Sequence, residues 1–310
     1  IPGQGDGGAE CAQAWMPLDY ADPEGDELPV LVKRFGQTED PTGQLWLLHG
    51  GPGASAVDEM AYLAYDLPDQ RPDLAIYAVD HRGIGGSGRL GCPDQEHPDS
   101  DWGESVSDAE WADCIYSMTE EWGDGLDQIN VTNSARDIGT LIAHLTEDEQ
   151  VLLWGGSYGT YLAQRYLQLF PDQPDGVVID GISPPGQGFM EYDLGMEITG
   201  QKMMNACAAE PSCAAHFDGD PWTTAQDVVA SFDHGHCAEL GADAGTIRYL
   251  LGALLMYDRV RDVVPALIHR MDRCSLEDMQ VIVNLWHSYF GAMDPLGSSP
   301  RGLPLPPRRP

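Results

Sequence analysis

Residues 155–159 read Gly-Gly-Ser-Tyr-Gly, and they stand between the apolar run 151–154 and an amphipathic stretch that begins at Tyr161. This order predicts a strand, a tight turn and a helix, with Ser157 at the apex of the turn. Small residues on either side of the apex let the strand and the helix pass closely beneath it. Ser157 is therefore a candidate nucleophile, although a Gly-Ser turn without chemistry fits the bare motif about equally well.

A second motif, His-Gly-Gly-Pro-Gly at 49–53, follows the apolar run 45–48. Three glycines around a proline exclude regular structure, so we expect a sharp turn with exposed backbone N–H groups at the end of a strand. Acyl transfer by serine hydrolases with an α/β sheet needs two such donors, one after the nucleophile and one after the third strand. These oxyanion-hole donors would be the amide groups of Tyr158 and Gly51.

The segment Asp-His-Arg-Gly-Ile-Gly-Gly-Ser-Gly at 80–88 contains the spacing G-x-G-x-x-G at Gly83, Gly85 and Gly88. A dinucleotide-binding turn of this kind should open a helix inside a βαβ unit and be followed by an acidic residue about 20 positions on. The loop at 89–93 follows instead. We interpret the segment as a structural loop beside the active site, and no cofactor is expected.

Taken together, the three motifs resemble the prolyl aminopeptidase and tripeptidyl aminopeptidase branch of the α/β-hydrolases. The resemblance runs from about Cys11 to about Cys213. It implies an α/β-hydrolase core with a mostly parallel central sheet, a helical cap after the sixth strand, and cleavage of peptide N-termini through an acyl-enzyme at Ser157. It also implies that cap carboxylates hold the substrate amine, for which Glu191, Asp193 and Glu197 are the candidates. For any one of the three residues, a solvated helix face is the more ordinary interpretation.

The family places its catalytic Asp and His after the seventh and eighth strands, beyond the cap. Only six extended segments are found here, and residues 184–290 have helical patterns. The six segments are residues 14–20, 30–35, 45–48, 75–79, 151–154 and 177–179. The predicted sheet is therefore incomplete, with about six of eight strands. We expect a flexible leader at 1–10, the core at 11–183 and the cap at 184–290.

No residue in hand is a convincing replacement for the missing acid and base. Asp180 follows the sixth strand, where some α/β-hydrolases have the catalytic carboxylate, and Asp294 lies near the end of the chain. The remaining histidines fall on cap segments without a preceding strand to direct them at Ser157. They are His216, His234, His236, His269 and His287.

The tail at 291–310 differs from the rest of the chain. From residue 295 it has six prolines, three arginines and no acidic residue. A proline-rich linker is the ordinary interpretation. We expect instead that the reading frame breaks near residue 295 and that the C-terminal part of the hydrolase is missing.

The chain has 50 acidic against 16 basic residues and a formal net charge of −34. Such a field repels nucleic acid and anionic lipid, and no apolar run is long enough for a membrane span. A peptide with a cationic N-terminus or a small acyl compound is a more suitable partner. The sequence does not indicate an oligomeric state.

Seven cysteines without metal-binding spacing indicate disulfides and an exported, secreted or periplasmic protein. We predict the pairs Cys92 with Cys114 and Cys207 with Cys213, because each closes a polar interval. Cys237 and Cys274 could join two cap helices. Cys11 is then the one cysteine left over from these pairs, which is a second sign of a missing C-terminal part.

Three functions remain open. The chain is a serine aminopeptidase, an esterase or lactonase on the same scaffold, or a truncated hydrolase that is inactive because it lacks His and Asp.

Overall fold

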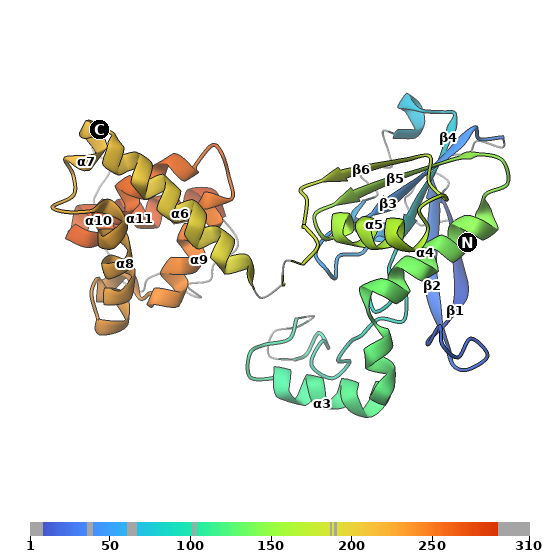
Figure 1. Cartoon of the computed structure of the whole chain (residues 1–310). Helices are drawn as coiled ribbons and strands as arrows, with labels where there is room; N and C mark the ends of the chain where they lie inside the picture. Colours follow the sequence, from blue (N-terminus) through green and yellow to red (C-terminus); the bar gives the residue numbers. More distant parts are fainter. Residues whose placement is uncertain are drawn as a thin grey trace, which may run out of the picture. The chain divides into compact units, whose positions relative to one another are not determined.

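The computed structural model describes residues 9–35, 40–60, 67–100, 103, 105–186, 188 and 191–290. The chain divides into two compact units, residues 1–187 and 188–310, which are drawn in Figure 1 and described separately below. The predicted tail at 291–310 and most of the predicted leader lie outside the described residues. Within the described residues, no helix combines the length and the apolar character that a membrane span requires.

The first unit is built on a six-stranded sheet with the order β1-β2-β4-β3-β5-β6. Its strands are β1 (Glu10–Pro17), β2 (Glu27–Phe35), β3 (Gly43–Leu48), β4 (Leu74–Val79), β5 (Gln150–Gly156) and β6 (Gly176–Asp180). The last four run parallel, whereas β1 and β2 pair antiparallel with their neighbours. The predicted α/β-hydrolase fold with a mostly parallel sheet of six strands is confirmed for the described residues.

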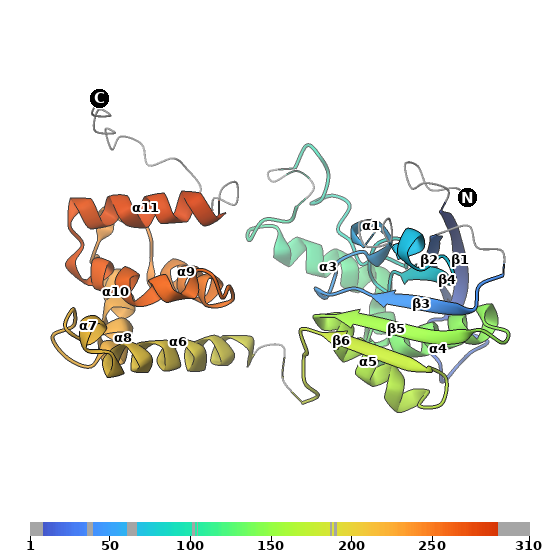
Figure 2. The same cartoon turned by 90° about the horizontal axis from the view of Figure 1, so that it is seen from above.

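Helices cover both faces of this sheet, as Figure 2 shows. The alternation of side chains along a strand sends Trp46 and Leu48 of β3 to one face and Leu47 to the other. The first face packs against α4 and α5, and the second packs against the short helix α1. The helical elements of this unit are α1 (Ala56–Glu59), α3 (Trp111–Trp122), η1 (Gly123–Gln128), α4 (Val131–Leu145) and α5 (Tyr158–Leu169).

The predicted first strand at 14–20 is shifted from the observed one, and its last three residues are not in a strand. β1 ends at Pro17 because the chain then turns back toward β2, with Leu18 N donating to Asp26 O at 2.7 Å. Tyr20 does not continue the sheet. Its hydroxyl donates to Asp137 Oδ1 of α4 at 2.8 Å.

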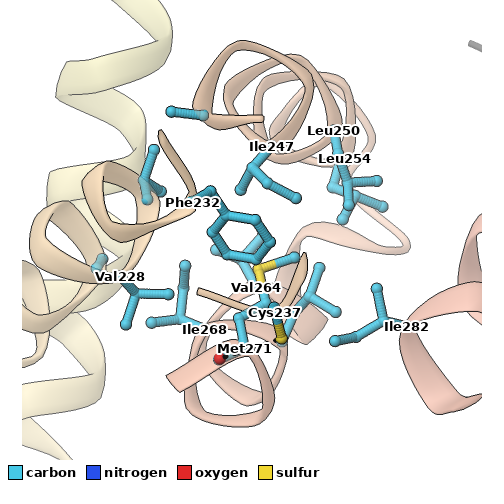
Figure 3. Close-up of a cluster of buried hydrophobic side chains, with 14 of the residues drawn as sticks. Val228, Phe232, Cys237, Ile247, Leu250, Leu254, Val264, Ile268, Met271 and Ile282 are labelled. Carbon is cyan, nitrogen blue, oxygen red and sulfur yellow. Dashed lines mark hydrogen bonds between the residues drawn. The ribbon is translucent and has the colours of Figure 1, made fainter. Parts of the chain in front are cut away.

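The second unit is helical in its described residues. It contains α6 (Tyr192–Ala209), α7 (Pro211–Ala214), α8 (Pro221–Ser231), η3 (Phe232–His234), η4 (Ala238–Leu240), α9 (Ala244–Leu255), η5 (Arg261–Val263), α10 (Val264–Arg273) and α11 (Leu276–Phe290). Apart from α7, these elements share one apolar core, part of which is drawn in Figure 3 around Phe232, Ile268 and Met271. This unit has its own core, as a separately folded cap would require.

The structure contains three disulfides. Cys92 is joined to Cys114 in the first unit, and Cys207 is joined to Cys213 in the second. The third disulfide joins Cys237 to Cys274, the pair that the sequence left open. Cys11 is not part of these three bonds.

Candidate active site

Four loops meet at one edge of the sheet because the strands that precede them are parallel. In the register of the sheet, Leu48 lies opposite Gly155 and Gly156 lies opposite Asp180. The loops that follow β3, β4, β5 and β6 therefore start at the same edge, where open α/β sheets bind their ligands. Ser157, the His-Gly-Gly-Pro-Gly loop and the loop after β4 all belong to this edge.

Ser157 connects β5 to α5 with φ 53° and ψ −120°. A positive φ is unfavourable for a residue that has a Cβ, and such strain is concentrated at functional sites. Hydrogen bonds hold the turn in place, since Ser157 N donates to Asp180 O at 2.9 Å and Thr160 Oγ1 donates to Ser157 O at 2.7 Å. The side chain of Ser157 is exposed, and among the described residues its hydroxyl makes no hydrogen bond. The structure thus presents a solvent-accessible hydroxyl at the apex of a strained turn.

The glycines around Ser157 are required by close packing. A Cβ on Gly159 would collide with the backbone carbonyl of Leu48, and a Cβ on Gly155 would lie 2.5 Å from Gly159 O. A Cβ on Gly50 would lie 2.9 Å from Ser157 Cβ and 3.3 Å from Ser157 Oγ. Substitution at any of the three would push apart the strand, the helix and the loop that meet at Ser157.

Gly51 and Tyr158, the predicted oxyanion donors, flank this position. Gly51 follows Gly50 with φ 108°, in the left-handed region that favours glycine. Tyr158 is the first residue of α5, so its N–H has no acceptor within the helix. The loop and the helix start therefore both reach the neighbourhood of Ser157 through adjacent residues. The oxyanion-hole assignment itself stays a prediction.

Asp80 fixes the loops around this edge, and the sequence analysis did not identify it. Its buried carboxylate accepts from Ser55 Oγ at 2.9 Å, from Val57 N at 3.1 Å and from Gly86 N at 3.1 Å. Ser55 is also the N-cap of α1. One carboxylate thus ties the loop after β3 to the loop after β4, and the segment 80–88 has the structural role that we expected from its sequence. In the described residues no helix follows Gly88 until α3.

The sequence matches the α/β hydrolase fold family over residues 45–214. This match covers more than half of the chain and includes all three motifs. The chain belongs to the α/β hydrolase fold family. The curated relatives of the chain include a serine protease and a tripeptidyl aminopeptidase.

The chain is 28% identical over 222 residues to the serine protease Hip1 of Mycobacterium tuberculosis, a match that covers 66% of this chain and 42% of the relative. It is 28% identical over 204 residues to the tripeptidyl aminopeptidase of Streptomyces lividans, with 61% and 38% covered. It is also 28% identical over 235 residues to carboxylesterase B of Mycobacterium tuberculosis, with 69% and 44% covered. The matches thus span less than half of the length of each relative.

Among solved structures, the chain is similar to the crystal structure of VinJ, with 18% identity and a TM-score of 0.37. That alignment covers 80% of this chain and 60% of the other.

Two histidines of this α/β hydrolase lie on the loops at the same edge. The ring of His81 lies 5.5 Å from the ring of Tyr158, and its Nδ1 lies 3.1 Å from Arg82 O. Burial lowers the pKa of His81 and raises the pKa of Tyr158 to about 12, so both rings are neutral near pH 7. His49 Nε2 lies 3.7 Å from Glu59 Oε2. Neither histidine is hydrogen-bonded to Ser157 within the described residues.

The other predicted acid and base candidates have different partners in this hydrolase. Asp180 meets Ser157 through its backbone carbonyl, and Asp294 lies outside the described residues. In the second unit, His236 Nε2 lies 2.7 Å from Met271 O, and the rings of His216 and His269 are 5.1 Å apart. His234 belongs to η3 and His287 to α11. The general base thus remains unassigned.

The predicted amine-binding carboxylates lie at the start of the second unit. Glu191 Oε2 accepts from Gly188 N at 3.2 Å, and Asp193 Oδ1 accepts from Leu194 N at 2.9 Å. Glu197 is exposed one turn after Asp193 and lines a cavity of the second unit. Their role toward a substrate amine stays a prediction.

His236, Cys237 and Cys274 are the described residues whose potential metal ligands come together, within 4.8 Å of one another. Both sulfur atoms belong to a disulfide, so they offer no thiolate to a metal ion.

Proposed function

We propose that Ser157 is the nucleophile of a serine hydrolase that releases residues from peptide N-termini through an acyl-enzyme. The observation that carries the proposal is the strained, exposed turn at Ser157, with φ 53° and ψ −120°, between a parallel strand and a helix. Ser157 Oγ adds to the substrate carbonyl carbon and loses its proton to a base. The departing amine takes a proton, and water then releases the acyl group.

In this proposal the amide groups of Gly51 and Tyr158 donate hydrogen bonds to the oxyanion of the tetrahedral intermediate. The support is positional, since Gly50 packs against Ser157 and Tyr158 begins α5. Two backbone donors at about 3 Å would stabilise the charge, because a preorganised donor contributes on the order of 10²-fold or more to turnover. The two amide groups are uncharged, so they can accommodate the neutral carbonyl oxygen of the substrate as well as the oxyanion that forms from it.

The peptide N-terminus is favoured as substrate by two observations. Relatives of this chain are named as a serine protease and a tripeptidyl aminopeptidase. The net charge of −34 attracts a cationic amine more than an anionic ligand. Glu191, Asp193 and Glu197 remain the candidates for holding that amine. The three disulfides favour an exported protein, because such bonds persist in oxidising compartments.

An esterase is the second candidate, because the match to carboxylesterase B covers 69% of this chain. Both activities need the same nucleophile and oxyanion donors and differ in the leaving group. An ester expels an alcohol and asks less of a general acid than an amide does. Rates on alanyl p-nitroanilide and on p-nitrophenyl butyrate would separate the two. The peptidase is supported if the anilide is cleaved, and the esterase is supported if only the ester is.

The direct test is acylation of the purified 310-residue chain by p-nitrophenyl acetate, with the modified peptide located by mass spectrometry. We expect the acetyl group on Ser157, and we expect Ser157→Ala to slow acylation on the order of 10³-fold or more. Ser183→Ala is the matched control, since Ser183 lies on the same edge and in the described residues its hydroxyl has no hydrogen bond. Equal acylation of the Ser157→Ala chain would refute the assignment.

We expect slow turnover from this chain even with Ser157 intact. Among the described residues no base is hydrogen-bonded to Ser157 Oγ, and an unassisted serine hydroxyl is a weak nucleophile. A burst of acylation followed by slow release would be the expected time course. Turnover as fast as that of typical serine hydrolases would contradict this expectation. His49 and His81 would then be the first candidate bases to substitute.

A further inference from the structure

The imidazole of His236 lies beside the Cys237–Cys274 disulfide of the second unit. A ring nitrogen of His236 and the two sulfur atoms all lie within 4.8 Å of one another. In the part of the chain that the structure describes, this is the one place where three or more His, Cys, Asp or Glu ligand atoms gather so closely. Cys237 is buried, whereas His236 and Cys274 are half-buried, so solvent reaches part of the group. A disulfide requires the two sulfur atoms but not the imidazole beside them.

The ring of His236 is held in a fixed orientation. Its Nε2 lies 2.7 Å from Met271 O, and because a carbonyl oxygen only accepts, Nε2 is the nitrogen that donates its proton. Nδ1 of the neutral ring therefore keeps its lone pair. The ring of Phe232 meets the imidazole edge to face, with the ring centres 5.8 Å apart. A histidine that donates its second nitrogen to a backbone carbonyl is arranged like a metal ligand, because that bond fixes the tautomer and the direction of the ring.

The backbone holds both cysteines in the left-handed region. φ is 56° at Cys237 and 47° at Cys274, where glycine would be the favourable residue. Backbone hydrogen bonds fix both positions without the help of the disulfide. Leu240 N donates to Cys237 O at 2.9 Å, and Cys274 N donates to Arg270 O at 2.9 Å as the end of α10. The two sulfur atoms therefore stay neighbours when the bond between them is open.

Zinc suits this set of ligands in the open state. Tetrahedral Zn²⁺ with Zn–S bonds of about 2.3 Å and a Zn–N bond of about 2.0–2.1 Å places its ligand atoms about 3.6–3.8 Å apart. The Cα atoms of Cys237 and Cys274 are 5.6 Å apart, so rotation of the two side chains suffices to separate the sulfur atoms. Two thiolates and a neutral imidazole balance the charge of Zn²⁺, so the half-buried site has no net charge to desolvate. Water fills the fourth position.

We propose that His236, Cys237 and Cys274 bind one Zn²⁺ in the dithiol state of the second unit, so that zinc and the disulfide compete for the same two sulfur atoms. A disulfide is made from two thiols, so this state precedes the bond and returns when an external dithiol reduces it. In that exchange the external dithiol becomes a disulfide, and each cysteine gains one electron and one proton. Zn²⁺ then displaces both thiol protons. No step involves Ser157, so failure of this proposal would leave the assignment of the nucleophile untouched.

Zinc titration of the 310-residue chain against a chromophoric chelator tests the proposal, before and after reduction by a water-soluble phosphine. A phosphine is suitable because it is oxidised to its oxide and adds no thiol that could bind the metal. We expect the reduced chain to bind Zn²⁺ at least about 100-fold more tightly than the oxidised chain, in which the imidazole is the only ligand of this site. Co²⁺ in place of zinc should give the charge-transfer band of a thiolate complex. Equal affinity in both states, or no zinc on the reduced chain, would overturn the proposal.

Cysteine variants locate the bound zinc. Cys237→Ser combined with Cys274→Ser should abolish the tight binding that follows reduction. Cys207→Ser combined with Cys213→Ser is the matched control, because that pair is also joined in the second unit but belongs to no group of three ligand atoms in the described residues. The control should bind zinc like the parent chain. Loss of binding in the control alone would contradict the site.

Histidine variants test the third ligand. His236→Gln can still donate to Met271 O but has no imidazole, so the reduced chain should bind zinc about tenfold or more weakly. His234→Gln is the control, since His234 is exposed in η3 and does not belong to the group. Circular dichroism of the same samples reports on the fold. Should reduction loosen the second unit, zinc should restore the helical signal of the parent chain and not that of His236→Gln. Unchanged affinity of the His236→Gln chain would contradict the site.

Discussion

The glycines of the two units have opposite relations to the space around them. In the first unit, Gly155 and Gly159 are in contact with backbone atoms, and a Cβ on either would collide with its neighbours. In the second unit, a Cβ on Gly200 or Gly252 would meet only side chains, at 3.4 Å or more. The first pair permits a close approach of strand, helix and loop, whereas the second pair lines a cavity of the second unit. The same residue type thus brings backbone segments close together around Ser157 in one region and meets only side chains in the other.

The buried charges of the two units differ in a similar way. In the first unit, Arg82 and Asp137 are both inaccessible to solvent, and the guanidinium also donates to Pro17 O, Leu18 O and Gln128 O. In the second unit, Asp278 is buried, but its partners Arg270 and Arg273 are 35% and 51% exposed. Loss of one partner of the Arg82–Asp137 pair should therefore lower the free energy of unfolding more than loss of one partner of Asp278.

Asp137→Ala should have the largest effect on stability. It leaves the buried Arg82 charge without compensation, which typically costs about 3–5 kcal/mol of unfolding free energy. Urea unfolding followed by circular dichroism measures the change, and hydrogen exchange of β4 and α4 locates it in the first unit. Asp73→Ala, at the exposed Arg71 pair, is the control and should leave the stability nearly unchanged. A small loss for Asp137→Ala would mean that solvent or another group neutralises Arg82.

Gly159→Ala should have the second largest effect on stability. The added Cβ would collide with the carbonyl of Leu48, a backbone atom that cannot turn aside, and such overpacking costs about 1–3 kcal/mol or more. The acylation of Ser157 should fall as well, because the strand and helix must separate. Urea unfolding and the acetylation assay on the same preparation measure both. A stable and reactive Gly159→Ala chain would break the contrast between the glycines of the two units.

Asp278→Asn should have a smaller effect that depends on pH. Burial opposes ionisation of this carboxyl, but Ser275, Arg273 and Arg270 lower its pKa from 3.8 to about 2. A lowered pKa in the folded state stabilises the fold above pH 3.8, and this stabilisation is lost as the pH falls toward 2. Because both arginines are partly exposed, we expect a loss of about 1 kcal/mol near neutral pH.

Urea unfolding at pH 7, 4, 3 and 2 tests this prediction. The difference between the Asp278→Asn chain and the parent should shrink between pH 4 and pH 2, with the exchange of α10 and α11 amides as the local readout. Ser275→Ala removes two hydrogen bonds with Asp278 but no charge and should show a weaker pH dependence. A constant difference across the series would show that the charge of Asp278 does not contribute.

Gly200→Ala should have the smallest effect on the free energy of unfolding, and it should raise this free energy where the other substitutions lower it. The new Cβ makes ordinary van der Waals contacts with the side chains of Leu255 and Trp222 and improves the helix propensity of α6, which is worth about 0.5–1 kcal/mol. A higher thermal midpoint, with α6 better protected from exchange, is the expected result. Destabilisation by this substitution would mean that the cavity is already filled, and the two classes of glycine would no longer be distinct.

The sequence was sufficient to predict the sheet and the turn at Ser157. Apolar runs followed at once by glycine motifs mark strands whose loops leave from the same edge when the strands are parallel, so Gly51 and Tyr158 could be expected near Ser157. The end of β1 was not predictable in the same way. Tyr20 has the character of a strand residue, but its hydroxyl is held by Asp137, which is 117 positions away.

The hydrogen bonds of Asp80 could not be predicted from the sequence for the same reason. Its partners Ser55 and Val57 are 25 and 23 positions away, and pairings at such separations depend on the fold. A signal was available in Ser55, which begins a capped helix by accepting from Asp58 N. The cavity of the second unit could not be predicted from the sequence, because it depends on how α6 and α9 pack and is lined by two glycines, Gly200 and Gly252, that look ordinary in the sequence.

The central claim is that Ser157 is a nucleophile whose oxyanion is held by the amide groups of Gly51 and Tyr158. The most direct measurement is a crystal structure of the chain after reaction with a p-nitrophenyl alkylphosphonate, whose tetrahedral phosphorus mimics the intermediate. The account predicts a phosphorus bond to Ser157 Oγ and one phosphonyl oxygen about 3 Å from both amide nitrogens. A phosphonate on another residue, or an oxygen that points away from the Gly51 and Tyr158 amides, would contradict it.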